Sequence, residues 1–147
     1  MNTAKGSSYG TDNKTTAMKD RQVILSTLWI FAMFNYLYCD VMTLMDPEGL
    51  KIIMSGQVGS MQITPGFLLG AAVLMETAIA MVLLSRVLKY SANRWANIIA
   101  GIIHTAAVSL SMFTGTPAIF YIFFAAIEIP CTLFIVWYAW RWPNPKG

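Results

Sequence analysis

Four ionisable side chains stand inside long apolar stretches of the sequence, one in each stretch. They are Asp40, Glu76, His104 and Glu128. A charged side chain at the centre of a bilayer costs about 2.5–3.5 kcal/mol or more, so such residues generally face the interior of a helix bundle and mark functional sites. Carboxyls and an imidazole that face one another could bind a cation or an amine, relay protons, or act as general acid and base on a lipophilic substrate.

Depth in the membrane favours a cluster of these groups. A helix rises about 1.5 Å per residue, which places Glu76, His104 and Glu128 near the midplane and Asp40 closer to the outer surface. Residues three or four positions apart share a helix face, which adds polar neighbours on the same faces. We expect Glu76 and His104 to be the catalytic acid and base. The candidate ligand-binding residues are Asp40, Glu128, Tyr36, Tyr121 and Asn35.

The elements that carry these residues are long apolar helices. The chain has 147 residues, of which 56% are hydrophobic and only 12% charged, whereas a soluble domain carries about 25% charged residues. Apolar runs of about 20 residues are long enough to cross a bilayer as helices. The sequence predicts an all-α, antiparallel four-helix membrane bundle, with spans at about 23–45, 66–88, 95–113 and 118–140.

The distribution of basic residues predicts the orientation. Nine of the ten Lys and Arg residues lie on one side of the predicted spans, and Lys51 alone lies on the other. Because Lys and Arg are enriched in cytoplasmic loops, both termini are expected to be cytoplasmic. Trp95, Trp137 and Trp140 fall at the same level, where an aromatic belt belongs. The predicted location is a multi-pass protein of the plasma membrane, or of the inner membrane in a bacterium.

Two segments outside the spans also carry predictions. Residues 1–21 are polar and are expected to form a disordered cytoplasmic tail, followed by the membrane domain at 22–142 and a short tail at 143–147. The outer loop that follows the first span is rich in apolar residues. It forms either a short interfacial helix near Pro47–Met54 or an irregular loop on the lipid headgroups.

Several classes of function are disfavoured. The basic residues are scattered rather than clustered, so nucleic-acid binding is not expected. One histidine inside the spans cannot provide bis-histidine haem ligation, and no Glu-x-x-His pair suggests a di-iron site. A single ion held by Glu76, His104 and Glu128 is chemically feasible but is not the preferred interpretation. No cofactor or resident metal is expected.

The order of the polar features resembles the EXPERA membrane fold of emopamil-binding-type sterol isomerases and the sigma-2 receptor. The matching positions are Asp40 with the following Val-Met-Thr-Leu-Met-Asp-Pro, Glu76, His104-Thr105 and Ile129-Pro130. The resemblance implies that Asp40 and Glu76 bind the polar or cationic end of a sterol-like ligand, supported by His104. Glu128 has no clear counterpart there. The whole chain also resembles small four-helix bacterial membrane families of unknown function.

Three functional hypotheses follow. The preferred one is an intramembrane pocket that binds a lipophilic small molecule, with isomerase-like proton transfer. The second is a small proton-coupled transporter, and the third is a structural membrane partner without a ligand. Membrane lipid is the expected surrounding in each case, and the sequence allows a homodimer.

Overall fold

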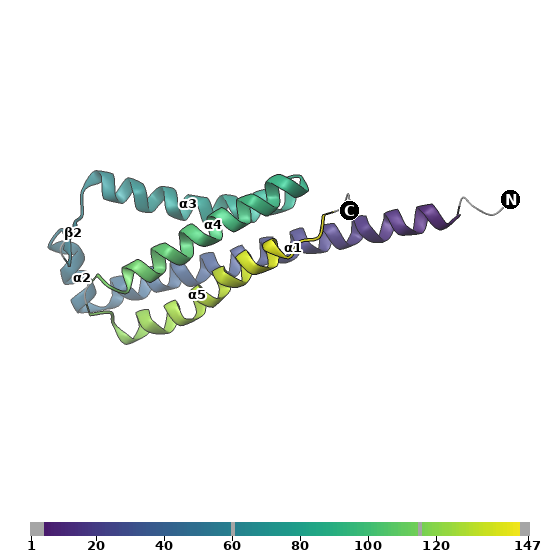
Figure 1. The fold of residues 1–147 in the computed structure, drawn as a ribbon. Coiled ribbons are helices and arrows are strands. Elements are labelled where there is room, and N and C mark those ends of the chain that lie inside the picture. The colour runs from purple at the N-terminus through teal and green to yellow at the C-terminus, as the bar shows by residue number, and fades with distance from the viewer. Residues whose placement is uncertain (1–4, 60, 115, 145–147) are drawn as a thin grey trace.

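The structure, a computed structural model, describes residues 5–59, 61–114 and 116–144. Four long helices run lengthwise beside one another, and a short helix and a hairpin lie together at one end (Figure 1). The elements are α1 (Lys5–Met45), α2 (Pro47–Met54), β1 (Gln57–Val58), β2 (Met61–Gln62), α3 (Pro65–Val87), α4 (Tyr90–Ser111) and α5 (Ile119–Trp140). The described part of the chain is therefore all-helical apart from this two-stranded hairpin.

Helix α1 begins much earlier than the predicted first span. It starts at Lys5 and runs through residues 5–21, which were expected to be disordered, and it projects beyond the other helices in Figure 1. The segment contains no proline, and a helix that has already formed grows by one hydrogen bond per added residue. A segment with few apolar residues is expected to make few packing contacts with the rest of the protein. Such a composition does not prevent the segment from forming a helix. Residues 1–4 and 145–147 lie outside the described residues.

The starts of α2 and α3 follow from local capping. Thr64 precedes α3 and accepts a hydrogen bond at its hydroxyl from the Phe67 backbone N–H (3.1 Å). Asp46 caps α2 in the same way through the Gly49 N–H (3.0 Å). A proline follows each cap at the first helical position, where its missing N–H removes no helical bond. The segment after the first span was expected to be either a short helix or an irregular loop, and the structure contains the short helix, α2.

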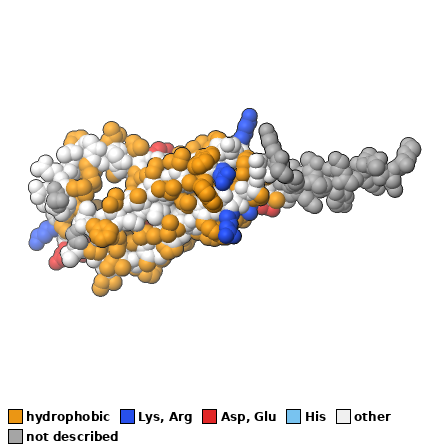
Figure 2. All heavy atoms as spheres, in the orientation of Figure 1, with side chains coloured by type: hydrophobic (Ala, Val, Ile, Leu, Met, Phe, Trp, Pro, Cys, Tyr) orange, Lys and Arg blue, Asp and Glu red, His pale blue; other side chains and the backbone are white. Residues whose placement is uncertain are grey.

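Within the described part of the chain, three helices are long and apolar enough to cross a membrane. They are the Thr16–Met45 part of α1, α3 and α5. Helix α4 has 22 residues but is more polar, and it is not among them. Apolar side chains cover much of the visible face along the middle of the molecule, with most of the visible Lys and Arg toward the end from which α1 projects and a smaller charged patch at the opposite end (Figure 2).

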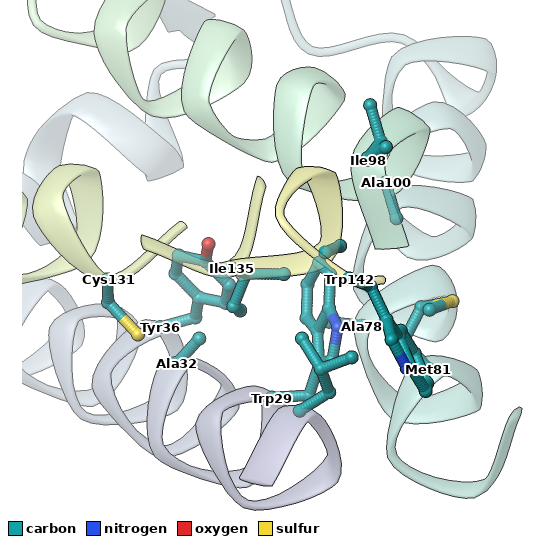
Figure 3. Packing of buried hydrophobic residues seen from close by; sticks show 12 residues of the cluster. Trp29, Ala32, Tyr36, Ala78, Met81, Ile98, Ala100, Cys131, Ile135 and Trp142 are labelled. Carbon is teal, nitrogen blue, oxygen red and sulfur yellow. The ribbon is translucent and has the colours of Figure 1, made fainter. Parts of the chain in front are cut away.

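The core forms where α1 meets the other long helices. Helix α1 packs against α3 and α5, and α4 packs mainly against α5. Trp29, Ala32 and Tyr36 project from α1 into the space between helices, where Ile135 of α5 is also buried (Figure 3). Gly101 marks the close approach of α4 to α5, because a Cβ added there would lie 2.6 Å from Cγ2 of Val136.

Helix α3 is packed unevenly along its length. Its buried residues, Ala78, Met81 and Ser85, all lie in its C-terminal half, whereas every residue from Pro65 to Val73 is exposed. Side chains from α1 hold the C-terminal end. The Ser26 hydroxyl donates to the Val82 carbonyl (2.7 Å), and the Gln22 amide donates to the Leu88 carbonyl (3.0 Å). Residues 65–73 of α3 therefore lie apart from the core.

Candidate functional site: a cavity with three unpaired polar groups

A cavity of about 150 Å³ lies among the four long helices. Its walls come from the C-terminal ends of α1 and α4 and from the N-terminal half of α5, so it occupies the half of the molecule that bears α2. The lining residues are Tyr36, Cys39, Asp40, Leu74, Met75, His104, Ala107, Val108, Ser111, Tyr121 and Glu128.

Three buried polar atoms of this lining have no hydrogen-bond partner in the described structure. They are the Tyr36 hydroxyl, Nε2 of His104 and Oε1 of Glu128. The three residues are only 5%, 2% and 4% exposed, respectively. Leaving a buried donor or acceptor unpaired costs about 1–3 kcal/mol, and native proteins contain few such groups. Three around one cavity leave it able to form hydrogen bonds with a molecule that enters it.

Aromatic packing fixes the orientation of His104. Its ring stacks on that of Tyr36, with centroids 5.4 Å apart and planes inclined by 19°. The Trp29 ring meets it edge-on at 5.3 Å. The imidazole is thus held between two α1 side chains while Nε2 keeps its hydrogen-bonding capacity free.

Glu128 sits on a segment of α5 that is joined closely to α4. The Thr132 hydroxyl donates to the backbone carbonyl of Glu128 (3.0 Å). The Thr105 hydroxyl of α4 donates to the hydroxyl oxygen of Thr132 (2.7 Å). Pro130 lies inside α5, yet the helix continues without interruption from Ile119 to Trp140. The backbone that carries the Glu128 carboxyl is therefore regular and anchored.

The electrostatic character of the lining is acidic. Asp40 is exposed at the rim and Glu128 is buried, and the lining contains neither Lys nor Arg. Tyr121 also contributes to the wall, but its hydroxyl already donates to Ser111 Oγ (2.5 Å). The free hydrogen-bonding capacity thus lies with Tyr36, His104 and the carboxyls.

The structure brings together five of the seven predicted site residues. Asp40, Glu128, Tyr36, Tyr121 and His104 all line the cavity. Glu76 and Asn35 do not. The Asn35 amide instead donates to the Phe31 carbonyl of its own helix (2.8 Å).

The placement of Glu76 corrects the expected pairing with His104. Its side chain is exposed, on the face of α3 opposite to the buried Ala78, Met81 and Ser85. Successive residues of a helix are rotated by about 100°. The position of Glu76 along the helix therefore did not determine the direction of its side chain. The α3 residues that line the cavity are Leu74 and Met75.

A buried polar network beside the cavity was missed by the sequence analysis. The Trp29 indole N–H donates to Oδ1 of Asn97 (2.8 Å), and the Ser85 hydroxyl donates to the same atom (3.2 Å). The Asn97 amide donates to Oδ1 of Asn93 (2.7 Å), whose own amide donates to the Ser85 carbonyl (2.6 Å). Asn93, Asn97 and His104 share one face of α4, a spacing that could have revealed the network. Each of its side chains has a partner, so its role is structural.

The site offers little for a metal ion. Among the residues that the structure describes, no group of three His, Cys, Asp or Glu side chains is placed to hold one. Of the three residues considered for a single ion, His104 and Glu128 line the cavity, but Glu76 points away from it. Cys39 and Cys131 are both buried and free.

The arrangement defines a class: a helical protein with three candidate membrane-crossing helices and an acidic, hydrogen-bonding cavity among them. The model of the DUF6326 family, described as a family of unknown function, matches residues 15–146, and the chain belongs to this family. No curated protein and no solved structure matches the chain. The resemblance to the EXPERA fold stays a prediction.

The Tyr36 hydroxyl provides a direct test of the unpaired cavity groups. Tyr36→Phe keeps the ring that stacks on His104 and removes an unpaired hydroxyl, so we expect the free energy of unfolding to stay the same or to rise by up to about 1 kcal/mol. Thermal unfolding of the detergent-purified variant measures this. A clear loss of stability would contradict the assignment, because it would mean that the hydroxyl has a partner in the empty protein.

Proposed function

We propose that this chain is a multi-pass membrane protein that binds the polar end of a lipophilic small molecule in its cavity. The observation that carries the proposal is the set of three buried, unpaired polar atoms around one cavity. A structural protein without a ligand would gain stability by pairing or removing these groups. A binding site needs them free.

In this proposal α4 is the fourth membrane span. Its low hydropathy comes mainly from Asn93, Arg94, Asn97 and His104. The two asparagines and the histidine are buried, and Arg94 lies near the start of the helix, where its guanidinium rests over the Trp140 ring. Most of the side chains that it exposes, such as Ile99, Ile102 and Leu110, are apolar. At about 1.5 Å per residue, its 22 residues are long enough for a hydrocarbon core of about 30 Å.

The orientation follows from the charges at one end of the helices. Arg21, Arg94 and Arg141 lie there together and interact with aromatic rings or carbonyls of the α5 end. The other end carries Asp46, Glu48 and Lys51. Since Lys and Arg favour the cytoplasmic side, we place both termini in the cytoplasm and the cavity in the outer half of the membrane.

The size and charge of the cavity suggest the class of ligand. A dry protein cavity of about 150 Å³ is large enough for benzene. The cavity of this protein has about the same volume, so it holds the head group of a ligand while the rest of the ligand extends outward. Two carboxyls without a basic residue favour a cationic head. The rings of Tyr36 and His104 add faces on which a cation can rest. A lipophilic amine therefore fits better than a quinone or a neutral sterol.

Proton transfer is the second activity that the lining supports. Nε2 of His104 and Oε1 of Glu128 both belong to the cavity wall and have no partner. An imidazole and a carboxyl in reach of one bound molecule can serve as general base and general acid. Glu128 thus takes the role that the sequence analysis gave to Glu76.

Ligand-dependent thermal stability tests the proposal. Purified protein is heated with lipophilic amines, quinones or sterols, as wild type and as Glu128→Gln and His104→Ala. A ligand at about 100 times its Kd stabilises the folded state by about 2.7 kcal/mol. We expect amines to raise the Tm of wild type and to lose this effect in both variants.

Glu76→Gln is the matched control, because it makes the same chemical change in a carboxyl outside the cavity. It should keep the full ligand-induced rise in Tm. A panel without any stabilisation, or a rise that Glu76→Gln abolishes and Glu128→Gln does not, would refute the cavity as the binding site.

A further inference from the structure

The carboxyl of Glu76 has no partner among the residues that the structure describes. It lies eleven residues from each end of α3 (Pro65–Val87), a helix apolar enough to cross a membrane. Its side chain is exposed, and no hydrogen bond or ion pair from the described residues reaches it. A carboxyl at mid-span that faces lipid is unfavourable by a few kcal/mol. The position therefore calls for a polar group from outside the chain.

The residues around Glu76 form a regular seam on α3. Leu69, Glu76 and Leu83 are seven residues apart, and Ala72 and Ile79 fall between them at the alternating spacing of three and four. All five are exposed, Leu69 and Leu83 by about two thirds of their surface. This is the spacing at which helices pair side by side. The α3 residues that pack within the chain lie on the opposite face.

We propose that two copies of this chain pair through this seam, with their α3 helices parallel and Glu76 of each copy facing Glu76 of the partner subunit. Two copies inserted in the same orientation are related by a two-fold axis along the membrane normal. Such an axis places each seam residue opposite its own equivalent. Leucine then meets leucine, and the two carboxyls meet at one level.

The carboxyl is the feature that favours a second copy over another partner. A protonated carboxyl both donates and accepts a hydrogen bond, so two of them are self-complementary and can share one or two protons. A single polar residue in a helix seam also fixes the register of pairing. The seam and the cavity lie on different sides of α3, so this pairing does not depend on the ligand proposal.

Disulfide cross-linking in membranes tests the pairing. Single cysteines are introduced at Leu69 or Leu83 in a chain with Cys39→Ala and Cys131→Ala, and the membranes are oxidised gently. The matched control is Leu68→Cys, which is exposed at almost the same depth but rotated by about 100° from Leu69. We expect several-fold more product at twice 16.3 kDa from Leu69→Cys and Leu83→Cys than from Leu68→Cys.

Mass measurement of the unmodified protein in lipid nanodiscs gives a second readout. We expect two copies per particle for wild type and for Glu76→Gln, whose amide still donates and accepts. Glu76→Leu should lose the fixed register, which would show as similar cross-linking at Leu68→Cys and Leu69→Cys. One copy per wild-type particle, equal cross-linking at those two positions in the presence of Glu76, or a cross-linked band containing a different protein would overturn the proposal.

Discussion

Replacing Gly101 with leucine is expected to force α4 away from α5 and to lower the free energy of unfolding by about 3 kcal/mol, the upper part of the usual range for overpacked cores. Even a single Cβ at this position would lie 2.6 Å from Cγ2 of Val136 and 3.3 Å from the Thr132 carbonyl oxygen. The Val136 methyl could shift, but the backbone of α5 could not without moving the Glu128 segment. Thermal unfolding followed by circular dichroism in detergent measures the loss.

Gly70→Leu is the control for this variant. A Cβ at Gly70 meets no atom within 4 Å, and the residue lies in the exposed half of α3, outside the seam around Glu76. Leucine there should leave stability unchanged or raise it by up to about 1 kcal/mol, because glycine is a poor helix former. Equal losses in the two variants would contradict the close contact between α4 and α5.

The second large effect is expected from Asn97→Leu. The change removes the acceptor of the Trp29 indole and of the Ser85 hydroxyl, and it also removes the donor to Asn93. Each buried group left unpaired costs about 1–3 kcal/mol, and we expect a total loss of about 3 kcal/mol because the groups partly find new partners. Denaturant unfolding in mixed micelles measures it.

Asn35→Leu provides the comparison, since the Asn35 amide bonds only to a carbonyl of its own helix. We expect that variant to lose less than about 1 kcal/mol. A loss from Asn97→Leu no larger than that from Asn35→Leu would mean that the network contributes little to stability.

Hydropathy and turn residues were sufficient to locate most of the helices. The predicted spans that begin near 66 and 118 correspond to helices that begin at Pro65 and Ile119. Apolar runs long enough for a bilayer are a strong signal, and proline and capping residues mark their ends. Hydropathy did not predict the helix at residues 5–21. A polar segment can be helical without burying an apolar face.

The site was predicted less completely, for a geometrical reason. Position along a helix fixes the depth of a side chain, whereas its direction depends on how the helix is rotated against its neighbours. His104 and Glu128 both line the cavity, whereas the side chain of Glu76 is exposed on the opposite face of α3. The role of Trp29 could not be predicted, because a tryptophan in an apolar run is typical of ordinary core packing. Only the structure shows that its indole N–H donates to Asn97.

Trp29 also joins two parts of the molecule that otherwise differ in character. Its N–H belongs to the Asn97 network, and its ring edge lies against His104 in the cavity wall. A molecule that orders His104 therefore also restrains the indole and the network behind it. Linkage of this kind is reciprocal: if the proposed ligand binds beside His104, loosening the two asparagines weakens its binding by the same free energy by which the bound ligand stabilises their network.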